Sequence, residues 1–234
     1  DVGEQYRPFW NDFVPAANQA IGEVPVRWAG QMDAVLSFFA LEHVTDPRSF
    51  VCAVHGLLKE GGAFYFLVPN IFANTADLVV ADHVNHFSAQ SLQRLLVDVG
   101  FTVREINGEA HNSAWVVVAE KSEGVGVEAE TKSISQSVHE MAAYWNEFGD
   151  RVSVFEKAGS GAAAIYGSGF YGTFIHASLE QPEAVVCFLD QNPHRQRQVL
   201  LGKPIVSPEA LPETVQRLYV GLNPRVAQTE LAAE

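Results

Sequence analysis

The sequence predicts an α/β protein made of two units whose sheets are mainly parallel. Short apolar runs, typical of buried strands, alternate with amphipathic helical segments in both halves of the chain. Residues 121–133 separate these halves with a polar, glycine-containing segment that has no apolar period. The chain has 234 residues, 47% of them hydrophobic, which suffices for two cores. We therefore expect a first domain over residues 1–120, a linker over 121–133 and a second domain over 134–234.

Four strands are predicted in the first half. DAVLSFF (33–39) and AFYFLVPN (63–70) are apolar runs with the length of buried parallel strands. FTVREI (101–106) and AWVVVAEK (114–121) follow, and we expect them to form an antiparallel pair at the edge of the sheet.

Two amphipathic helices lie between these strands. The first covers residues 46–60, with Asp46 as its N-cap, a proline at its first position and Gly61-Gly62 as its predicted end. The second covers residues 88–101, with a serine cap and a glycine just before its last residue as the stop signal.

The second half starts with a long helical segment and then repeats the alternation of strands and helices. The predicted elements are a helix over 134–157, strands over 162–167, 184–190 and 217–222, a helix over 170–180 and a terminal helix. We expect this half to be a helix followed by a small Rossmann-like domain.

Charge and cysteine usage limit the classes of partner. Fifteen basic against 28 acidic residues give a formal charge of −13, which argues against binding to a nucleic-acid backbone. Cys52 and Cys187 each lie inside an apolar run, as buried free thiols of a reducing compartment do. Because no apolar run is long enough to cross a bilayer and no signal peptide is visible, we expect a cytoplasmic protein without a membrane partner.

Residues 30–120 resemble the second half of a class I S-adenosylmethionine-dependent methyltransferase. The resemblance rests on the ordered series DAVLSFFALEHVTDPRSFVCAVHGLLKEGGAFYFLVPN and DHVNHFSAQSLQRLLVDVGF. It implies that the first unit is an incomplete class I methyltransferase fold, with S-adenosylmethionine as cofactor. In such a fold the cofactor would contact Ser37, Phe38 and Phe39 at a strand exit, and the ribose-binding acid would fall near Asp1. Because the family's glycine-rich turn has no counterpart upstream of Asp33, we expect a truncated chain rather than a remnant that no longer binds the donor.

A polar loop after the second predicted strand carries the candidate catalytic groups. An imidazole titrates near neutrality and can take a proton from a nucleophile as it attacks the donor methyl. His83 is the predicted general base, Asp82 the carboxylate that orients it, and His86 a second candidate. Glu42 and His43, in contrast, are interpreted as residues that cap a turn.

A glycine loop in the second half admits two interpretations. Gly167, Gly169 and Gly172 have the GxGxxG spacing of a dinucleotide-binding turn, and Asp190 ends the next strand, where a ribose-binding acid would lie. The same glycines also suit a packing turn in a small α/β domain. The motif alone does not decide between these interpretations.

A second resemblance concerns residues 160–225. IYGSGFYGTFIHASL, VVCFLDQNPHRQRQVLLGKPIVSPEAL and LYVGLNP are similar to the C-terminal domain of sugar C-methyltransferases. It implies a sugar or nucleotide-linked sugar as small-molecule substrate, near Asn70, the three glycines and Asp190. In that family a Tyr-His-Glu-His run supplies active-site groups, and here only its acid and last histidine are matched, by Asp82 and His83. The tyrosine is replaced by Val80, which leaves C-, O- or N-methylation open.

Three functions therefore compete. The leading one is an S-adenosylmethionine-dependent methyltransferase that acts on a sugar or nucleotide-linked sugar. The others are an NAD-dependent oxidoreductase that uses the glycine loop, and a non-catalytic or nucleotide-sugar-binding protein. We assign no metal site, since two distant cysteines cannot form a thiolate zinc site. The sequence does not specify the oligomeric state.

Overall fold

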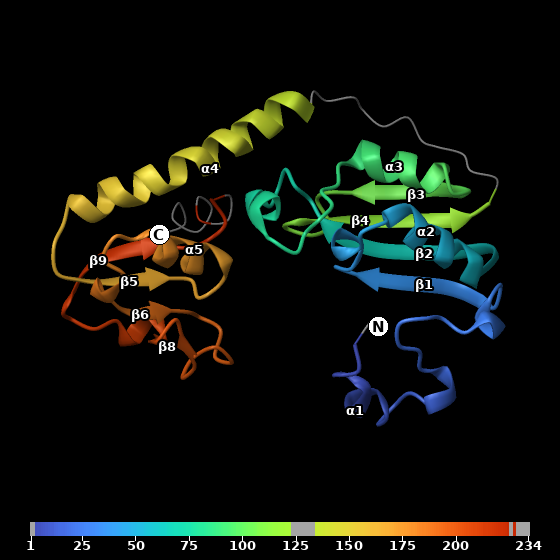
Figure 1. Ribbon diagram of the computed structural model, residues 1–234, viewed down its shortest axis with the longest axis horizontal. Helices are drawn as coiled ribbons and strands as arrows, with labels where there is room; N and C mark the ends of the chain where they lie inside the picture. Colours follow the sequence, from blue (N-terminus) through green and yellow to red (C-terminus); the bar gives the residue numbers. More distant parts are fainter. Residues whose placement is uncertain (1–2, 123–133, 225–226, 228–234) are drawn as a thin grey trace. The chain divides into compact units, whose positions relative to one another are not determined.

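The computed structural model describes residues 3–122, 134–224 and 227 (Figure 1). Contacts divide the chain into two compact units, the first made of Asp1–Asn70 and Asp82–Glu130, the second of Ile71–Ala81 and Thr131–Glu234. Both units contain strands and helices, as expected for a mixed α/β protein. Most of the predicted linker and most of the predicted terminal helix lie outside the described residues.

The first unit is built on a sheet of mixed direction. Its strands are β1 (Met32–Phe38), β2 (Leu58–Pro69), β3 (Phe101–Asn107) and β4 (Ala114–Lys121), in the order β1-β2-β4-β3. β1 and β2 are parallel, whereas β4 is antiparallel to both of its neighbours. The antiparallel edge pair is confirmed. A mainly parallel sheet is wrong for this unit, because a short connection from β3 lets β4 return as a hairpin strand.

Two helices cover one face of this sheet. They are α2 (Pro47–Leu57) and α3 (Ala89–Val97). Shorter helices precede both of them: α1 (Arg7–Trp10), η1 (Ala16–Asn18), η2 (Val26–Trp28) and η3 (Leu41–His43). The predicted caps are confirmed, since Asp46 Oδ1 accepts a hydrogen bond from the Ser49 N–H and Ser88 begins α3 with a capping box. Val51 and Leu92 then bury against Phe64 in the core.

The end of α2 differs from the prediction. The helix stops at Leu57 and β2 begins at Leu58, so Gly61 and Gly62 lie inside the strand segment instead of ending the helix. Leu58 is completely buried and pairs with Met32 of β1, and this burial favours the sheet over another helical turn. Gly61 has a φ of 74°, which favours glycine. This conformation allows the register shift between β1 and β2 that lies between Leu58 and Ala63.

The second unit has the mainly parallel sheet that the sequence predicts. Its strands are β5 (Ala162–Tyr166), β6 (Val185–Leu189), β7 (Val199–Leu200), β8 (Lys203–Val206) and β9 (Val215–Val220). They lie in the order β7-β8-β6-β5-β9, and all pairs except β7 with β8 are parallel. Two short helices precede strands: η5 (Pro182–Ala184) comes directly before β6, and η6 (Pro208–Ala210) lies between β8 and β9.

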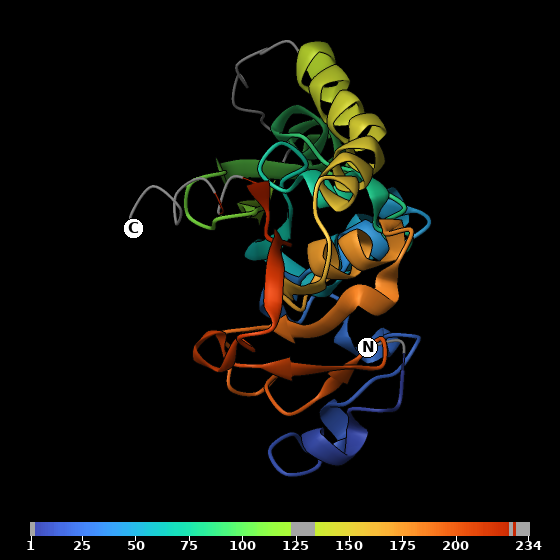
Figure 2. The same ribbon diagram turned by 90° about the vertical axis from the view of Figure 1, so that its left-hand side faces the viewer.

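The core of this unit lies between the sheet and two helices. α4 (Ile134–Lys157), yellow in Figures 1 and 2, and α5 (Phe170–Ser178) bury Phe148 and Ile175 against Ile165 of β5. Cys187 is buried in β6 as predicted, whereas burial of Cys52 is wrong, because its side chain lies on the exposed side of α2. Within the described ranges, no helix combines the length and the apolar character that a bilayer crossing needs.

Residues 71–81 leave the first unit and pack in the second, which differs from the predicted domain boundary. This segment, which contains η4 (Thr75–Val79), follows β2 directly. The carbonyl of Thr75 accepts a hydrogen bond from Trp145 Nε1 at 2.8 Å, and the carbonyl of Ala73 accepts one from Asn223 Nδ2 at 3.0 Å. The Tyr171 hydroxyl accepts the Ala76 N–H at 3.0 Å. The sequence does not predict this domain assignment, because the residues that bind the segment are 70 or more positions away along the chain.

We expect Tyr171→Phe to destabilise the second unit by about 1–3 kcal/mol, because the Ala76 N–H is buried and would lose its acceptor. Tyr144→Phe is the matched control, since it removes a hydroxyl from an aromatic cluster of the same unit and keeps the ring contacts with Trp145 and Phe148. Urea unfolding followed by tryptophan fluorescence gives both free energies of unfolding. Equal stability of the two variants would contradict the anchoring role of Tyr171.

Candidate active site

The carboxyl ends of β1 and β2 form one edge of the first unit, where the predicted cofactor residues lie. Ser37 is half-buried, whereas Phe38 and Phe39 are 54% and 42% exposed. Phe39 has a φ of 50°, in the left-handed region, and its N–H still binds the carbonyl of Leu67 at 2.9 Å. The chain thus turns sharply at the end of β1 while it stays attached to β2, and two aromatic rings are left accessible.

A buried turn follows this reversal. η3 places Leu41 and Glu42 at 1% exposure, with the Glu42 carboxylate inside the unit. The carbonyl of Glu42 accepts hydrogen bonds from the N–H groups of Val84 and Asn85, at 2.9 and 3.2 Å. Asn85 also donates from its side chain to the carbonyl of Val44 at 2.5 Å. The turn after β1 and the loop after β2 are therefore held together by several hydrogen bonds.

This attachment brings two acid–histidine pairs together. His43 Nδ1 lies 2.9 Å from the carbonyl oxygen of Asp82 and 3.5 Å from its Oδ2. The rings of His43 and His83 meet edge to face, with centroids 4.8 Å apart. The Asp82 carboxylate, predicted to orient His83, thus contacts His43. Sequence reasoning missed Glu42 and His43 as members of the site, although they lie only a few residues after β1 ends at Phe38.

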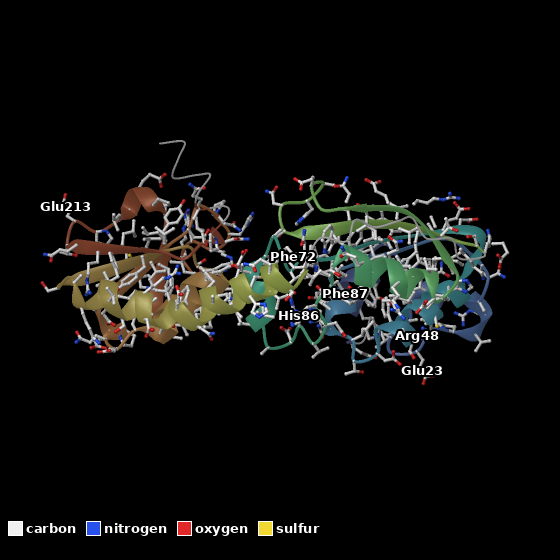
Figure 3. The ribbon with its side chains drawn as sticks, turned by 90° about the horizontal axis from the view of Figure 1, so that it is seen from above. Glu23, Arg48, Phe72, His86, Phe87 and Glu213 are labelled. Atoms are coloured by element: carbon white, nitrogen blue, oxygen red, sulfur yellow. The ribbon has the colours of Figure 1, made fainter. Side chains whose placement is uncertain are left out.

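The other predicted residues of this unit lie at the margins of the site. Asn70 is buried, its N–H binds the carbonyl of Ser113 at 2.9 Å, and it forms a bridge to Phe87. His86 is exposed in the same loop as His83, next to Phe87, as labelled in Figure 3. Asp1 lies outside the described residues.

In the second unit the three glycines have different structural roles. Gly167 has a φ of 99°, and a Cβ there would meet the Gly221 carbonyl oxygen at 2.5 Å. A Cβ on Gly172 would overlap the Gly167 carbonyl oxygen, so this glycine permits close packing of α5 on the loop. Gly169 begins α5, and a Cβ there would meet nothing within 4 Å. Gly167 and Gly172 thus allow close packing of the backbone, whereas the space beside Gly169 is unoccupied.

Asp190 is engaged by the loop itself. Its carboxylate accepts hydrogen bonds from the N–H and hydroxyl of Ser168 and from the N–H of Asn192. Partial burial acts to raise the pKa of Asp190, but these hydrogen bonds and the nearby Arg195 guanidinium outweigh it and hold the pKa below its usual value. A cavity of 340 Å³ adjoins these groups and is lined by Gly169 as well.

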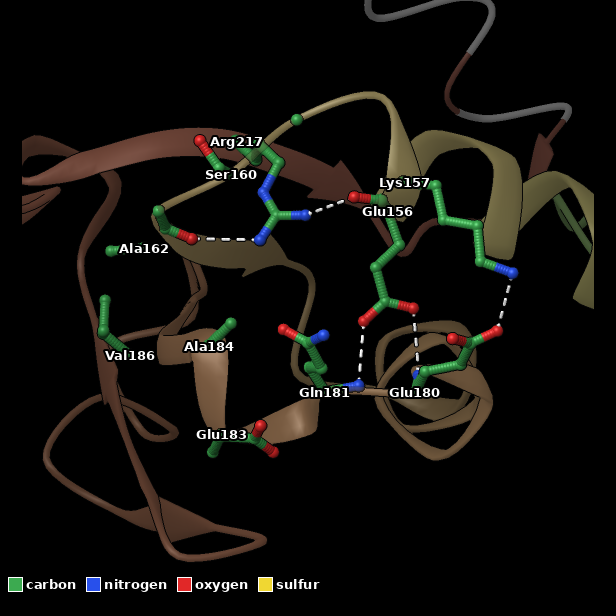
Figure 4. A pocket seen from close by; sticks show the side chains of 12 residues that line it. Glu156, Lys157, Ser160, Ala162, Glu180, Gln181, Glu183, Ala184, Val186 and Arg217 are labelled. Carbon is green, nitrogen blue, oxygen red and sulfur yellow. Dashed lines mark hydrogen bonds and ion pairs between the residues drawn. The ribbon is translucent and has the colours of Figure 1, made fainter.

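A larger cavity of 620 Å³ lies elsewhere in the second unit, near the amino ends of β5 and β6 (Figure 4). Four of the charged residues that line it, Glu156, Lys157, Glu180 and Arg217, are paired with their surroundings. The buried Glu156 carboxylate accepts the N–H groups of Glu180 and Gln181, both at 2.9 Å, and the Glu156 carbonyl accepts Arg217 Nη1 at 2.8 Å. Lys157 forms an ion pair with Glu180. These contacts fasten α4 to the sheet, so we assign this cavity a structural role.

Comparisons with known proteins find methyltransferases. Residues 5–106 match the family model described as methyltransferase domain. A protein of Mycolicibacterium smegmatis, named as a probable S-adenosylmethionine-dependent methyltransferase, is 28% identical over 115 residues, 48% of this chain and 44% of the relative. The ubiquinone biosynthesis O-methyltransferase of Erwinia tasmaniensis is 46% identical over 52 residues, 22% of this chain and 21% of the relative.

A crystal structure of an S-adenosylmethionine dependent methyltransferase from Mesorhizobium loti is also similar, at 16% identity and a TM-score of 0.41, over 51% of this chain and 77% of that one. Because this TM-score is low, only the sequence matches are used as evidence. They support a class I methyltransferase domain with S-adenosylmethionine as its cofactor, in agreement with the first resemblance. The chain spans less than half the length of the two curated relatives.

Proposed function

We propose that this protein transfers a methyl group from S-adenosylmethionine to a small-molecule acceptor. One coincidence carries the proposal. Residues 5–106, which match a methyltransferase domain, include the Glu42, His43 and His83 cluster at the carboxyl ends of β1 and β2. Ligands of open α/β sheets bind at this edge of the sheet.

The residues at the end of β1 fit one side of the cofactor. Phe38 and Phe39 expose rings that can cover an apolar or aromatic part of the ligand, and Ser37 can offer its hydroxyl. When bound, S-adenosylmethionine supplies an electrophilic methyl group on a sulfonium. Asp1, the proposed ribose-binding acid, lies outside the described residues.

We assign removal of the acceptor proton to the loop after β2. His83 is half-buried there, and its ring packs edge to face with that of His43. Asp82 contacts His43 and so holds this loop in place. His83 is the proposed general base, because it is an accessible imidazole beside the proposed cofactor edge, and histidine is the side chain that most often serves as a general base. His86 is the second candidate.

A sugar or nucleotide-linked sugar is the proposed acceptor, on the resemblance of residues 160–225 to a sugar C-methyltransferase domain. In this proposal the second unit is Rossmann-like and faces the nucleotide part with its glycine loop. The open N-terminus of α5 at Gly169 and the Arg195 guanidinium at the 340 Å³ cavity suit an anionic group. Gly167, Gly172 and Asp190 shape this loop, and Asn70 belongs to the proposed acceptor side of the first unit.

Isothermal titration of the full-length protein with S-adenosylhomocysteine and with NAD tests the cofactor. We expect saturable binding of S-adenosylhomocysteine only. Phe38→Ala should weaken it about tenfold, since loss of a contacting ring costs roughly 1.5 kcal/mol or more. Leu36→Ala, on the same exposed face of β1, is the matched control and should leave affinity unchanged. Binding of NAD alone would support the oxidoreductase alternative and refute the proposal.

A further inference from the structure

Glu42, His43 and His83 form a cluster of metal-ligating side chains that the sequence analysis did not assign. Each offers one ligand atom, and these atoms all lie within 4.8 Å of one another. Two come from η3 after β1 and one from the loop after β2. Unlike a cluster of exposed acidic groups, this cluster contains a carboxylate with 1% exposure. A buried carboxylate is costly unless a cation or hydrogen bonds compensate its charge.

The orientation of His43 suits a metal ligand. A carbonyl oxygen can only accept a hydrogen bond, so the contact of His43 Nδ1 with the Asp82 carbonyl at 2.9 Å places the ring proton on Nδ1. The lone pair of the neutral ring is then on Nε2, which lies 3.9 Å from Glu42 Oε1. Metal-binding histidines commonly donate their other N–H to a carbonyl or carboxylate in this way. Asp82 offers both groups to the same nitrogen.

We propose that Glu42, His43 and His83 bind one divalent transition-metal ion, with Zn²⁺ the best fit to two imidazoles and a carboxylate. Bonds of about 2.0–2.2 Å require the three side chains to draw together by an ångström or so. The backbone is already in place, because the Glu42 carbonyl binds the N–H groups of Val84 and Asn85. Three protein ligands leave a fourth position open to water or to an acceptor oxygen.

The consequence for catalysis rests on the proposed function, whereas the binding of the ion does not. An acceptor hydroxyl bound at the open position would lose its proton to water more easily, because the cation stabilises the alkoxide. The alkoxide oxygen then forms a bond to the donor methyl while the methyl–sulfur bond breaks, and S-adenosylhomocysteine leaves. In the metal-loaded protein His83 is therefore a ligand, and it serves as a base only without the ion.

Metal titration of the full-length protein tests the site without reference to activity. After treatment with EDTA and its removal, the protein is titrated with Zn²⁺ by calorimetry and with Co²⁺ by visible absorption. We expect one ion per chain and nitrogen–oxygen d–d bands for Co²⁺. His43→Ala and His83→Ala should each weaken Zn²⁺ binding at least tenfold, and Glu42→Gln should do the same if it folds. His86→Ala, three residues from His83 in the same loop, should bind like the parent.

Absence of stoichiometric binding by the parent would overturn the proposal, and so would parental affinity in His43→Ala and His83→Ala. Equal losses in His86→Ala would identify adventitious binding by surface histidines and overturn it as well. Binding of one ion by a protein that does not bind S-adenosylhomocysteine would support the metal site and refute the proposed function. The two proposals therefore fail separately.

Discussion

His83→Ala should lower the turnover of methyl transfer by about two orders of magnitude or more, the usual contribution of a general base. The side chain is half-buried near the carboxyl ends of β1 and β2, where the proposed function would bring an acceptor to the donor methyl. Donor affinity should change little, because the proposed role is removal of the acceptor proton. Replacement of the exposed His86 should cost less.

The measurement is transfer of labelled methyl from S-adenosylmethionine by the full-length protein at saturating substrate, with titration of S-adenosylhomocysteine as the control for donor binding. Near-parental turnover of a folded His83→Ala variant would show that the histidine is structural. A loss shared equally by His86→Ala would assign the effect to the loop as a whole instead of to one imidazole.

The effect of chelation separates the two roles of His83. If His83 acts as a base, EDTA treatment of the parent leaves turnover unchanged and only the substitution lowers it. If His83 is a ligand of a bound cation, EDTA reproduces the loss in the parent, and added Zn²⁺ restores the parent but not His83→Ala. Either result leaves the position of the residue beside the reacting groups intact.

Local signals in the sequence predicted most elements of the fold. The N-caps at Asp46 and Ser88 depend on neighbours three residues away, so their hydrogen bonds follow from sequence alone. β1 likewise follows from a short apolar run. The end of α2 was predicted incorrectly, because burial of Leu58 against β1 is a tertiary effect that ends the helix before the stop signal at Gly61 is reached.

The candidate site shows the same division. Asp82 and His83 were predicted from their place in a polar loop after the second strand and from a partial match to a motif, whereas Glu42 and His43 were interpreted as turn caps. Their significance depends on hydrogen bonds between segments about 40 residues apart, including the contact of His43 with Asp82. The packing of Thr75 under Trp145 has the same origin. The periodicity of apolar residues cannot predict such contacts, since each of them depends on two distant segments that meet only in the folded protein.

The second large effect is expected for Gly172→Ala, which should destabilise the second unit by about 2 kcal/mol. A Cβ at this position would overlap the Gly167 carbonyl oxygen and lie 3.1 Å from the Gly167 carbonyl carbon and 3.3 Å from Ile165 Cγ2. Such overpacking costs up to about 3 kcal/mol, because two backbone segments must separate. The higher helix propensity of alanine returns about 1 kcal/mol. The steric term is the larger one, so α5 should move away from the glycine loop.

Gly149→Ala is the matched control. This glycine lies inside α4 of the same unit, and a Cβ there would meet nothing within 4 Å. The same substitution should therefore stabilise the unit by up to about 1 kcal/mol through helix propensity alone. Urea unfolding followed by the fluorescence of Trp145, which packs against Phe174 of α5, compares both variants with the parent. If Gly172→Ala unfolds at the parental urea concentration, the close approach of α5 to Gly167 is not required for the stability of this unit.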